Sequence, residues 1–132
     1  MRTLDTNILA RLLLADDAGQ CARAKALLAQ KQVFTAPVTV MLELVWVLEA
    51  NERTPFHIRK ALDLLLAVPN FQPQEPDSLR QALAWYAQGM DFADALHLAL
   101  STRQEQLLTF DKRFIKAAAR LGLPDWVAGV PG

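Results

Sequence analysis

The sequence predicts an α/β fold in which helices form layers around a mostly parallel sheet. Short apolar segments of strand length alternate with longer helical patterns along the chain, and acidic or polar residues stand where strands pass into helices. No repeat, low-complexity tract or linker interrupts this order. The 132 residues, 52% of them hydrophobic, are expected to form a single domain over residues 1–132 that buries about two-thirds of its unfolded surface.

The first quarter of the chain predicts a strand, two helices and a second strand. Residues 1–4 form the first strand, and residues 5–7 offer capping side chains before the apolar run of residues 8–14. A second helix begins near residues 16–17 and carries apolar residues on one face. Residues 33–36 predict the next strand.

Two helices and a short extended segment follow. Pro37 and the cap candidate Thr39 open a strongly apolar helix that ends at residues 51–53. Thr54 is the expected N-cap of the next helix, since a proline at the first helical position and an apolar stripe come after it. Residues 70–76 contain two prolines, which restricts them to a short edge strand or a loop.

The chain then predicts two more helices. Asp77 or Ser78 caps a helix that runs to Gly89, a suitable C-terminal stop. Another helix begins near Asp91. Both are expected to cover the sheet.

The C-terminal part predicts a strand, a helix and a last strand. Residues 106–110 form a strand that leads directly into Asp111. Apolar residues at helical spacing between residues 114 and 121 mark the buried face of a helix, and Gly122 ends it. Residues 126–130 are the last expected strand.

Composition restricts the class of protein. Basic and acidic residues balance at 14 each, which argues against a general nucleic-acid coat protein. The single cysteine, Cys21, excludes an intramolecular disulfide, and the N-terminus does not resemble a signal peptide, so we expect a cytoplasmic location. The longest apolar stretch is interrupted by Pro37 and Glu43 and is shorter than the ~20 residues that span a bilayer, so no membrane association is expected.

Four acidic residues lie in apolar surroundings: Asp5, Glu43, Asp94 and Asp111. Glu43 has only uncharged neighbours three and four residues away in its helix, so we expect a buried carboxylate without a local partner. Two of the acids end strands and two lie early in helices. Because helix N-termini and strand C-termini share one edge of a parallel sheet, all four are expected to project toward that edge.

Carboxylates that lie close together repel one another unless a cation is shared between them. Oxygen-only ligands favour Mg²⁺ or Mn²⁺, which can activate water for phosphodiester hydrolysis. The remaining charged residues carry four more basic than acidic groups once the four acids are set aside. This excess would suit a polyanionic substrate.

The chain resembles the PIN-domain ribonucleases of the VapC toxin type. Four stretches carry the resemblance, in the family's order: residues 4–9 (LDTNIL), 42–48 (LELVWVL), 91–99 (DFADALHLA) and 108–114 (LTFDKRF). The resemblance implies a three-layer α/β sandwich with a central, mostly parallel sheet and Mg²⁺-dependent endoribonuclease activity. It also implies a homodimer and a toxin that inhibits translation until a small cognate antitoxin protein binds it.

The resemblance also assigns site residues. By position, Asp5, Glu43, Asp94 and Asp111 match the family's acidic metal ligands, and Asp91 is an additional acid one turn before Asp94. The polar residues that match supporting positions are Thr6, Asn7 and Thr109. The cations placed to contact RNA phosphates are Arg11, Lys112, Arg113 and Lys116.

Structural alternatives stay open for individual residues. Asp5, Asp91 and Asp111 each precede a helix, so each could be an N-cap. Asp94 could form a surface pair with His97. The cations could also form no more than a solvated helix face.

Two other functions compete with the metal-dependent nuclease. A metal-independent ribonuclease could use His57 and His97 as acid and base, and would leave a 2′,3′-cyclic phosphate. A catalytically silent PIN-like module could instead use the acidic residues to bind a basic partner peptide.

Overall fold

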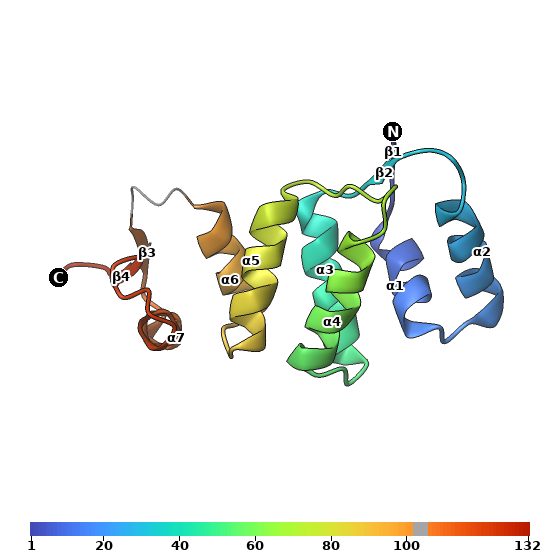
Figure 1. Cartoon of the computed structure of the whole chain (residues 1–132). Helices are drawn as coiled ribbons and strands as arrows, with labels where there is room; N and C mark the ends of the chain where they lie inside the picture. The colour runs from blue at the N-terminus through green and yellow to red at the C-terminus, as the bar shows by residue number, and fades with distance from the viewer. Residues whose placement is uncertain (102–105) are drawn as a thin grey trace. The chain divides into compact units, whose positions relative to one another are not determined.

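The computed structural model describes residues 1–101 and 106–132, which form two compact units, Met1–Pro76 and Asp77–Gly132. The α/β class is confirmed, because this described part of the chain contains seven helices and short parallel strands (Figure 1). The single domain over residues 1–132 stays a prediction. None of the described helices is both long and apolar enough to span a membrane.

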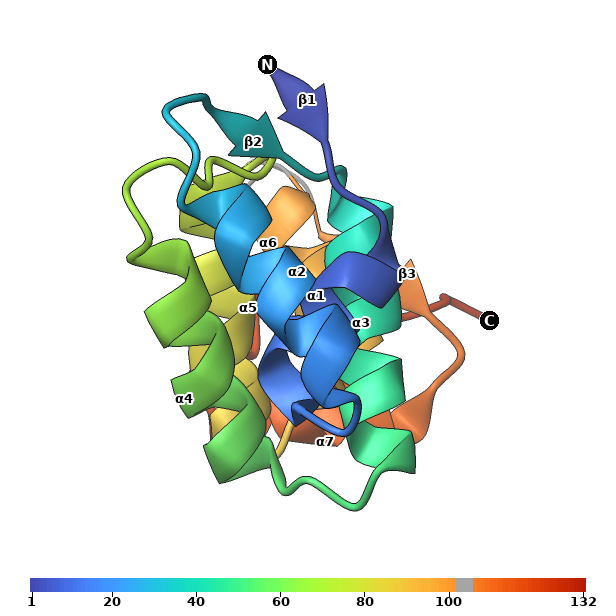
Figure 2. The same ribbon diagram turned by 90° about the vertical axis from the view of Figure 1, so that its right-hand side faces the viewer.

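The first unit contains two short strands and four helices, close to the expected boundaries. In chain order they are β1 (Arg2–Thr3), α1 (Thr6–Leu14), α2 (Ala18–Leu28), β2 (Phe34–Thr35), α3 (Val38–Ala50) and α4 (Pro55–Leu66). Strands β1 and β2 lie side by side and pair in parallel, with Arg2 opposite Phe34 (Figure 2). Phe71 forms a single parallel bridge to Phe34, which confirms a short edge segment in residues 70–76.

Local capping explains where two of these helices begin. The Asp17 carboxylate accepts a hydrogen bond from the Gln20 amide at 2.9 Å, and the Thr54 hydroxyl accepts one from the His57 amide. The expected cap at Thr39 is wrong. Helix α3 begins at Val38 after Pro37, whose side chain has no hydrogen-bonding atom, and Thr39 lies inside the first turn.

The core of the first unit lies between its helices. Helix α1 packs against α2 and α3, and α3 packs against α4. The largest fully buried side chains of α1, α3 and α4 are Leu9, Met41, Leu44, Val45, Leu48, Ile58 and Leu62. Their apolar surface is the main stabilising contribution to this unit.

The second unit contains most of α5 (Pro76–Ala87), followed by α6 (Phe92–Leu100), β3 (Leu107–Thr109), α7 (Lys112–Arg120) and β4 (Val127–Gly129). Strands β3 and β4 pair in parallel, as expected. Helix α5 begins at Pro76, so the expected cap at Asp77 or Ser78 is wrong and both residues lie in the first turn. Parallel pairing is therefore confirmed in each unit, and the single central sheet of a three-layer sandwich stays a prediction.

Candidate functional site

Asp5 links strand β1 to helix α1. It is the exposed N-cap residue of α1, and its Oδ1 accepts a hydrogen bond from the Thr6 amide at 2.8 Å. The capping alternative is thus confirmed for Asp5. Since the cap uses Oδ1, Oδ2 is left to bind another group.

Glu43 differs from the expectation, because it is exposed rather than buried. Helix α3 buries Val40, Met41 and Leu44, whereas Glu43 lies in an exposed stripe with Trp46, which is 51% exposed. Water therefore solvates the carboxylate, and its lack of a local partner costs the fold little. An exposed carboxylate is also accessible to a cation or substrate.

Asp91 and Asp94 have different roles at the start of α6. Asp91 is the N-cap residue, and its Oδ2 accepts a hydrogen bond from the Asp94 amide at 3.1 Å. The Asp94 carboxylate is half-buried and accepts no hydrogen bond from any residue in the described ranges. Burial raises the pKa of Asp94 most, the negative charges of Asp91 and Asp111 raise it further, and His97 lowers it.

Asp111 is the N-cap residue of α7. Its Oδ1 accepts hydrogen bonds from the amides of Arg113 at 2.9 Å and Phe114 at 3.4 Å. The Asp111 amide donates to the Thr109 hydroxyl at 3.0 Å, which fixes the turn between β3 and α7. Thr109 therefore orients the backbone that carries Asp111.

The donor set of the second unit suits a hard cation. Besides burial, the negative charges of Asp91 and Asp111 raise the pKa of Asp94, and a divalent cation would remove this repulsion. Within each unit, no three His, Cys, Asp or Glu side chains of the described residues are arranged as a ready metal-binding group. The assignment of Asp5, Glu43, Asp94 and Asp111 as ligands stays a prediction.

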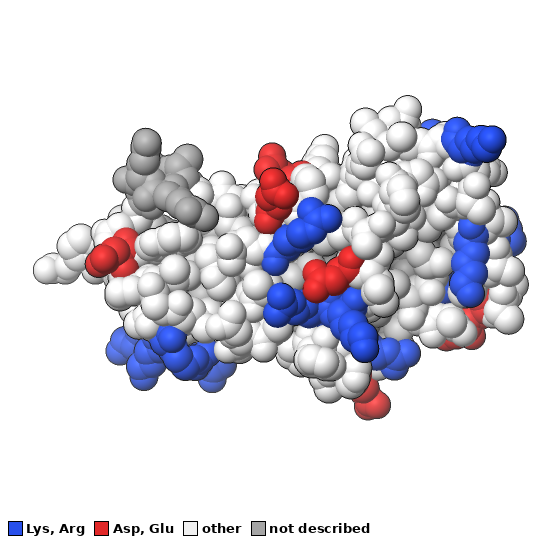
Figure 3. Space-filling view, in the orientation of Figure 1, with Lys and Arg blue, Asp and Glu red and all other residues white. Residues whose placement is uncertain are grey.

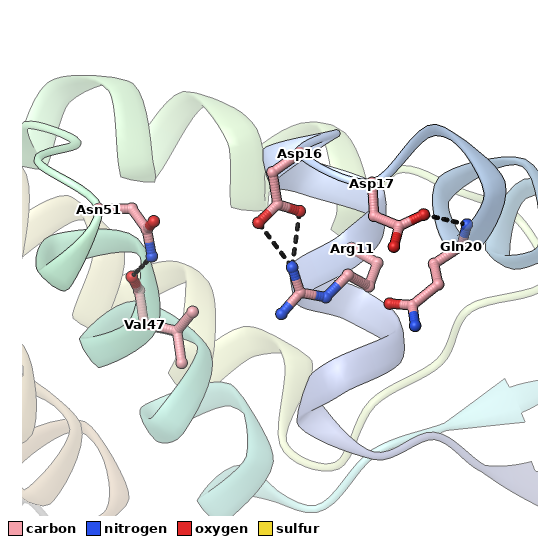
Figure 4. Close-up of polar contacts among 6 residues, drawn as sticks. All are labelled: Arg11, Asp16, Asp17, Gln20, Val47 and Asn51. Carbon is pink, nitrogen blue, oxygen red and sulfur yellow. Dashed lines mark hydrogen bonds and ion pairs between the residues drawn. The ribbon is translucent and has the colours of Figure 1, made fainter.

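The polar residues after Asp5 have separate surroundings. Thr6 is buried, and its Oγ1 has no hydrogen-bond partner among residues 1–101 and 106–132. Asn7 and Arg11 line a hollow of about 390 Å³ whose lining contains no acidic residue. The Arg11 guanidinium donates to both carboxylate oxygens of Asp16, at 2.7 and 2.6 Å, and lowers the pKa of Asp16 (Figure 4).

The cations of α7 are exposed, as expected. Lys112, Arg113 and Lys116 form no ion pair with any residue that the structure describes, and basic side chains gather over α7 (Figure 3). The sequence interpretation did not single out Phe110, which is 87% exposed beside Asp111. An aromatic residue directly before a cap residue at a strand end was the available signal.

Comparison with known families decides what kind of protein carries these residues. A model of the PIN domain matches residues 3–120, which include all five of the acids Asp5, Glu43, Asp91, Asp94 and Asp111. The chain belongs to the PIN-domain family. PIN domains have a nuclease-type fold, are generally nucleases and typically use divalent metals. No curated protein and no solved structure matches the chain.

Proposed function

We propose that this PIN domain is an endoribonuclease that depends on Mg²⁺ or Mn²⁺, and that it is the toxin of a VapC-like toxin–antitoxin pair that inhibits translation. The observation that carries the nuclease proposal is a half-buried Asp94 that feels the negative charges of Asp91 and Asp111, in a chain that matches the PIN family over residues 3–120. A half-buried carboxylate with two like-charged neighbours is unfavourable without a cation. The toxin role is supported by the resemblance of the four sequence stretches.

The ligands we propose are Asp5, Glu43, Asp94 and Asp111. A bound Mg²⁺ or Mn²⁺ would supply a water of lowered pKa and neutralise charge that develops on the phosphate. The carboxylates of Asp5 and Asp111 each keep one oxygen outside the cap hydrogen bond, so capping and ligation are compatible. The cap hydrogen bonds also restrain the orientation of these side chains.

Residues next to the proposed ligands orient them. Thr109 accepts the Asp111 amide hydrogen bond, and Asp91 accepts that of Asp94, so both acids are held at defined helix starts. Asp91 also keeps one carboxylate oxygen outside its cap hydrogen bond, so we retain it as an additional candidate ligand beside Asp94. The exposed cations of α7 would bind the phosphates of the RNA.

Cleavage of a panel of structured RNAs by the purified chain tests the proposal. We expect cleavage with Mg²⁺ or Mn²⁺ and none in EDTA, with products that carry no 2′,3′-cyclic phosphate. The matched control is Glu43→Gln, which keeps the size of an exposed side chain and should lose activity without losing the fold. Equal cleavage by both chains in EDTA would contradict metal dependence, and the absence of cleavage by either would support a silent module.

The proposed partners follow from the same scheme. A small cognate antitoxin is expected to inhibit cleavage, and a homodimer is the expected assembly. Co-purification with the product of a neighbouring small reading frame, and light scattering of the free chain, test these two points.

A further inference from the structure

Phe110 is unusually exposed for an aromatic residue at its position. It lies at the residue before the N-cap of α7, where an apolar side chain often packs against the fourth residue of the helix. That residue is Ile115, whose Cδ1 lies 3.6 Å from the position of a Cβ atom built on Gly129, so it is directed toward β4. Phe110 remains 87% exposed and does not serve as a helix staple.

The cations that follow Phe110 are not explained by helix stability. Lys112 and Arg113 occupy the first turn of α7, where the helix dipole disfavours positive charge. Neither they nor Lys116 forms an ion pair with a residue in the described ranges. Arg120 is different, because its guanidinium lies over Gly89, with Nη2 2.9 Å from the position of a Cβ atom there. The three unpaired cations suit an anion held at the start of α7.

An aromatic ring in water beside unpaired cations matches the chemistry of single-stranded nucleic acid. Each unpaired base offers a face for stacking, and the phosphates on either side require positive charge. In a duplex the bases are already stacked, so the ring has no base face to bind. Leu108, which is 57% exposed, lies two residues before Phe110, but it has no π-face.

We propose that Phe110 is a stacking platform for an unpaired base of the RNA, and that Lys112, Arg113 and Lys116 bind the phosphates beside that base. This inference rests on the proposed ribonuclease function and assigns the contact with one unpaired base to Phe110. Phe110 is a positioning residue, since its proposed contact is with a base and not with the reacting phosphate.

Fluorescence anisotropy with a labelled single-stranded 12-nucleotide RNA tests the stacking contact. Titrations run in EDTA, and a denaturing gel afterwards verifies that the RNA is intact. Phe110→Ala should raise the dissociation constant for the single strand by about 5- to 100-fold and change binding of the matched duplex by less than about twofold. Phe110→Trp should bind as tightly as the native chain.

Two controls separate stacking from general apolar contact. Phe110→Leu keeps an apolar side chain without a π-face and should bind as weakly as Phe110→Ala. Phe56→Ala removes a 67% exposed phenylalanine from α4 and should change nothing. Full RNA binding by Phe110→Leu or Phe110→Ala would overturn the proposal.

A protein partner at this surface would give a different result. Loss of a dimer on Phe110→Ala, measured by light scattering, with unchanged RNA binding would overturn the proposal in favour of an interface between copies. Failure here is distinguishable from failure of the nuclease function. Cleavage by the native chain in Mg²⁺ is measured separately, and it can persist when the anisotropy results contradict stacking.

Discussion

Replacing Asp111 separates its structural role from its proposed chemical role. The carboxylate caps α7 through one good hydrogen bond to the Arg113 amide at 2.9 Å and a long one to the Phe114 amide at 3.4 Å. Loss of an N-cap side chain costs about 1 kcal/mol, so Asp111→Ala should lower the free energy of unfolding by about that amount. For a chain of this size the melting temperature should fall by about 4 °C.

Asp111→Asn gives the matched comparison. Asparagine caps helices about as well as aspartate, so the free energy of unfolding should stay within about 0.5 kcal/mol of the native value. Cleavage of RNA in Mg²⁺ should nevertheless fall by more than about 100-fold in both variants, because the carboxylate charge is absent from both. Urea unfolding followed by circular dichroism measures the stability of each chain. The reasoning would be refuted by an active Asp111→Asn variant, or by equal destabilisation in the two variants.

Three further predictions concern stability. The raised pKa of Asp94 means that its ionised form is disfavoured in the folded chain, so without divalent metal the free energy of unfolding should fall as pH rises from about 4 through the raised pKa. Asp94→Asn should remove this loss. Urea unfolding measures it, and parallel stability–pH profiles for the native chain and the variant would contradict the prediction. Thr6→Val replaces a buried hydroxyl that lacks a hydrogen-bond partner among the described residues, so it should raise the free energy of unfolding by about 1 kcal/mol. A loss of stability would instead indicate that the hydroxyl is hydrogen-bonded in solution. Gly89→Ala should lower the free energy of unfolding by about 1–2 kcal/mol, because φ at residue 89 is +109°. The same loss should occur in an Arg120→Ala background if backbone strain, and not the nearby guanidinium, is its cause.

Features that depend on neighbouring residues in the sequence were predictable. The N-caps Asp17, Thr54 and Asp91 are recognisable because a capping side chain bonds amides one turn away. The short parallel strands lie within the expected segments, because apolar runs bounded by polar residues mark strands in the sequence. The start of α5 at Pro76 was also accessible from local rules, because proline is favoured at the first helical position.

Features that depend on tertiary packing were not predictable in the same way. Helix α3 is apolar on most of its circumference, so its sequence alone does not reveal that the stripe containing Glu43 and Trp46 faces water. Local sequence also does not reveal that Phe110 is exposed or that Ile115 is directed toward β4. The coupling of Asp94 to Asp111 joins residues from α6 and the end of β3, and strand-edge reasoning could anticipate it only as a tendency.

A crystal of the chain soaked in Mn²⁺ tests the central claim most directly. Anomalous scattering would locate the ion independently of the protein coordinates. We predict a peak about 2.1 Å from carboxylate oxygens of Asp5, Glu43, Asp94 and Asp111, or of most of them. A well-ordered crystal with no Mn²⁺ at these carboxylates, or with Mn²⁺ bound only elsewhere, would contradict the proposal of an acidic metal site.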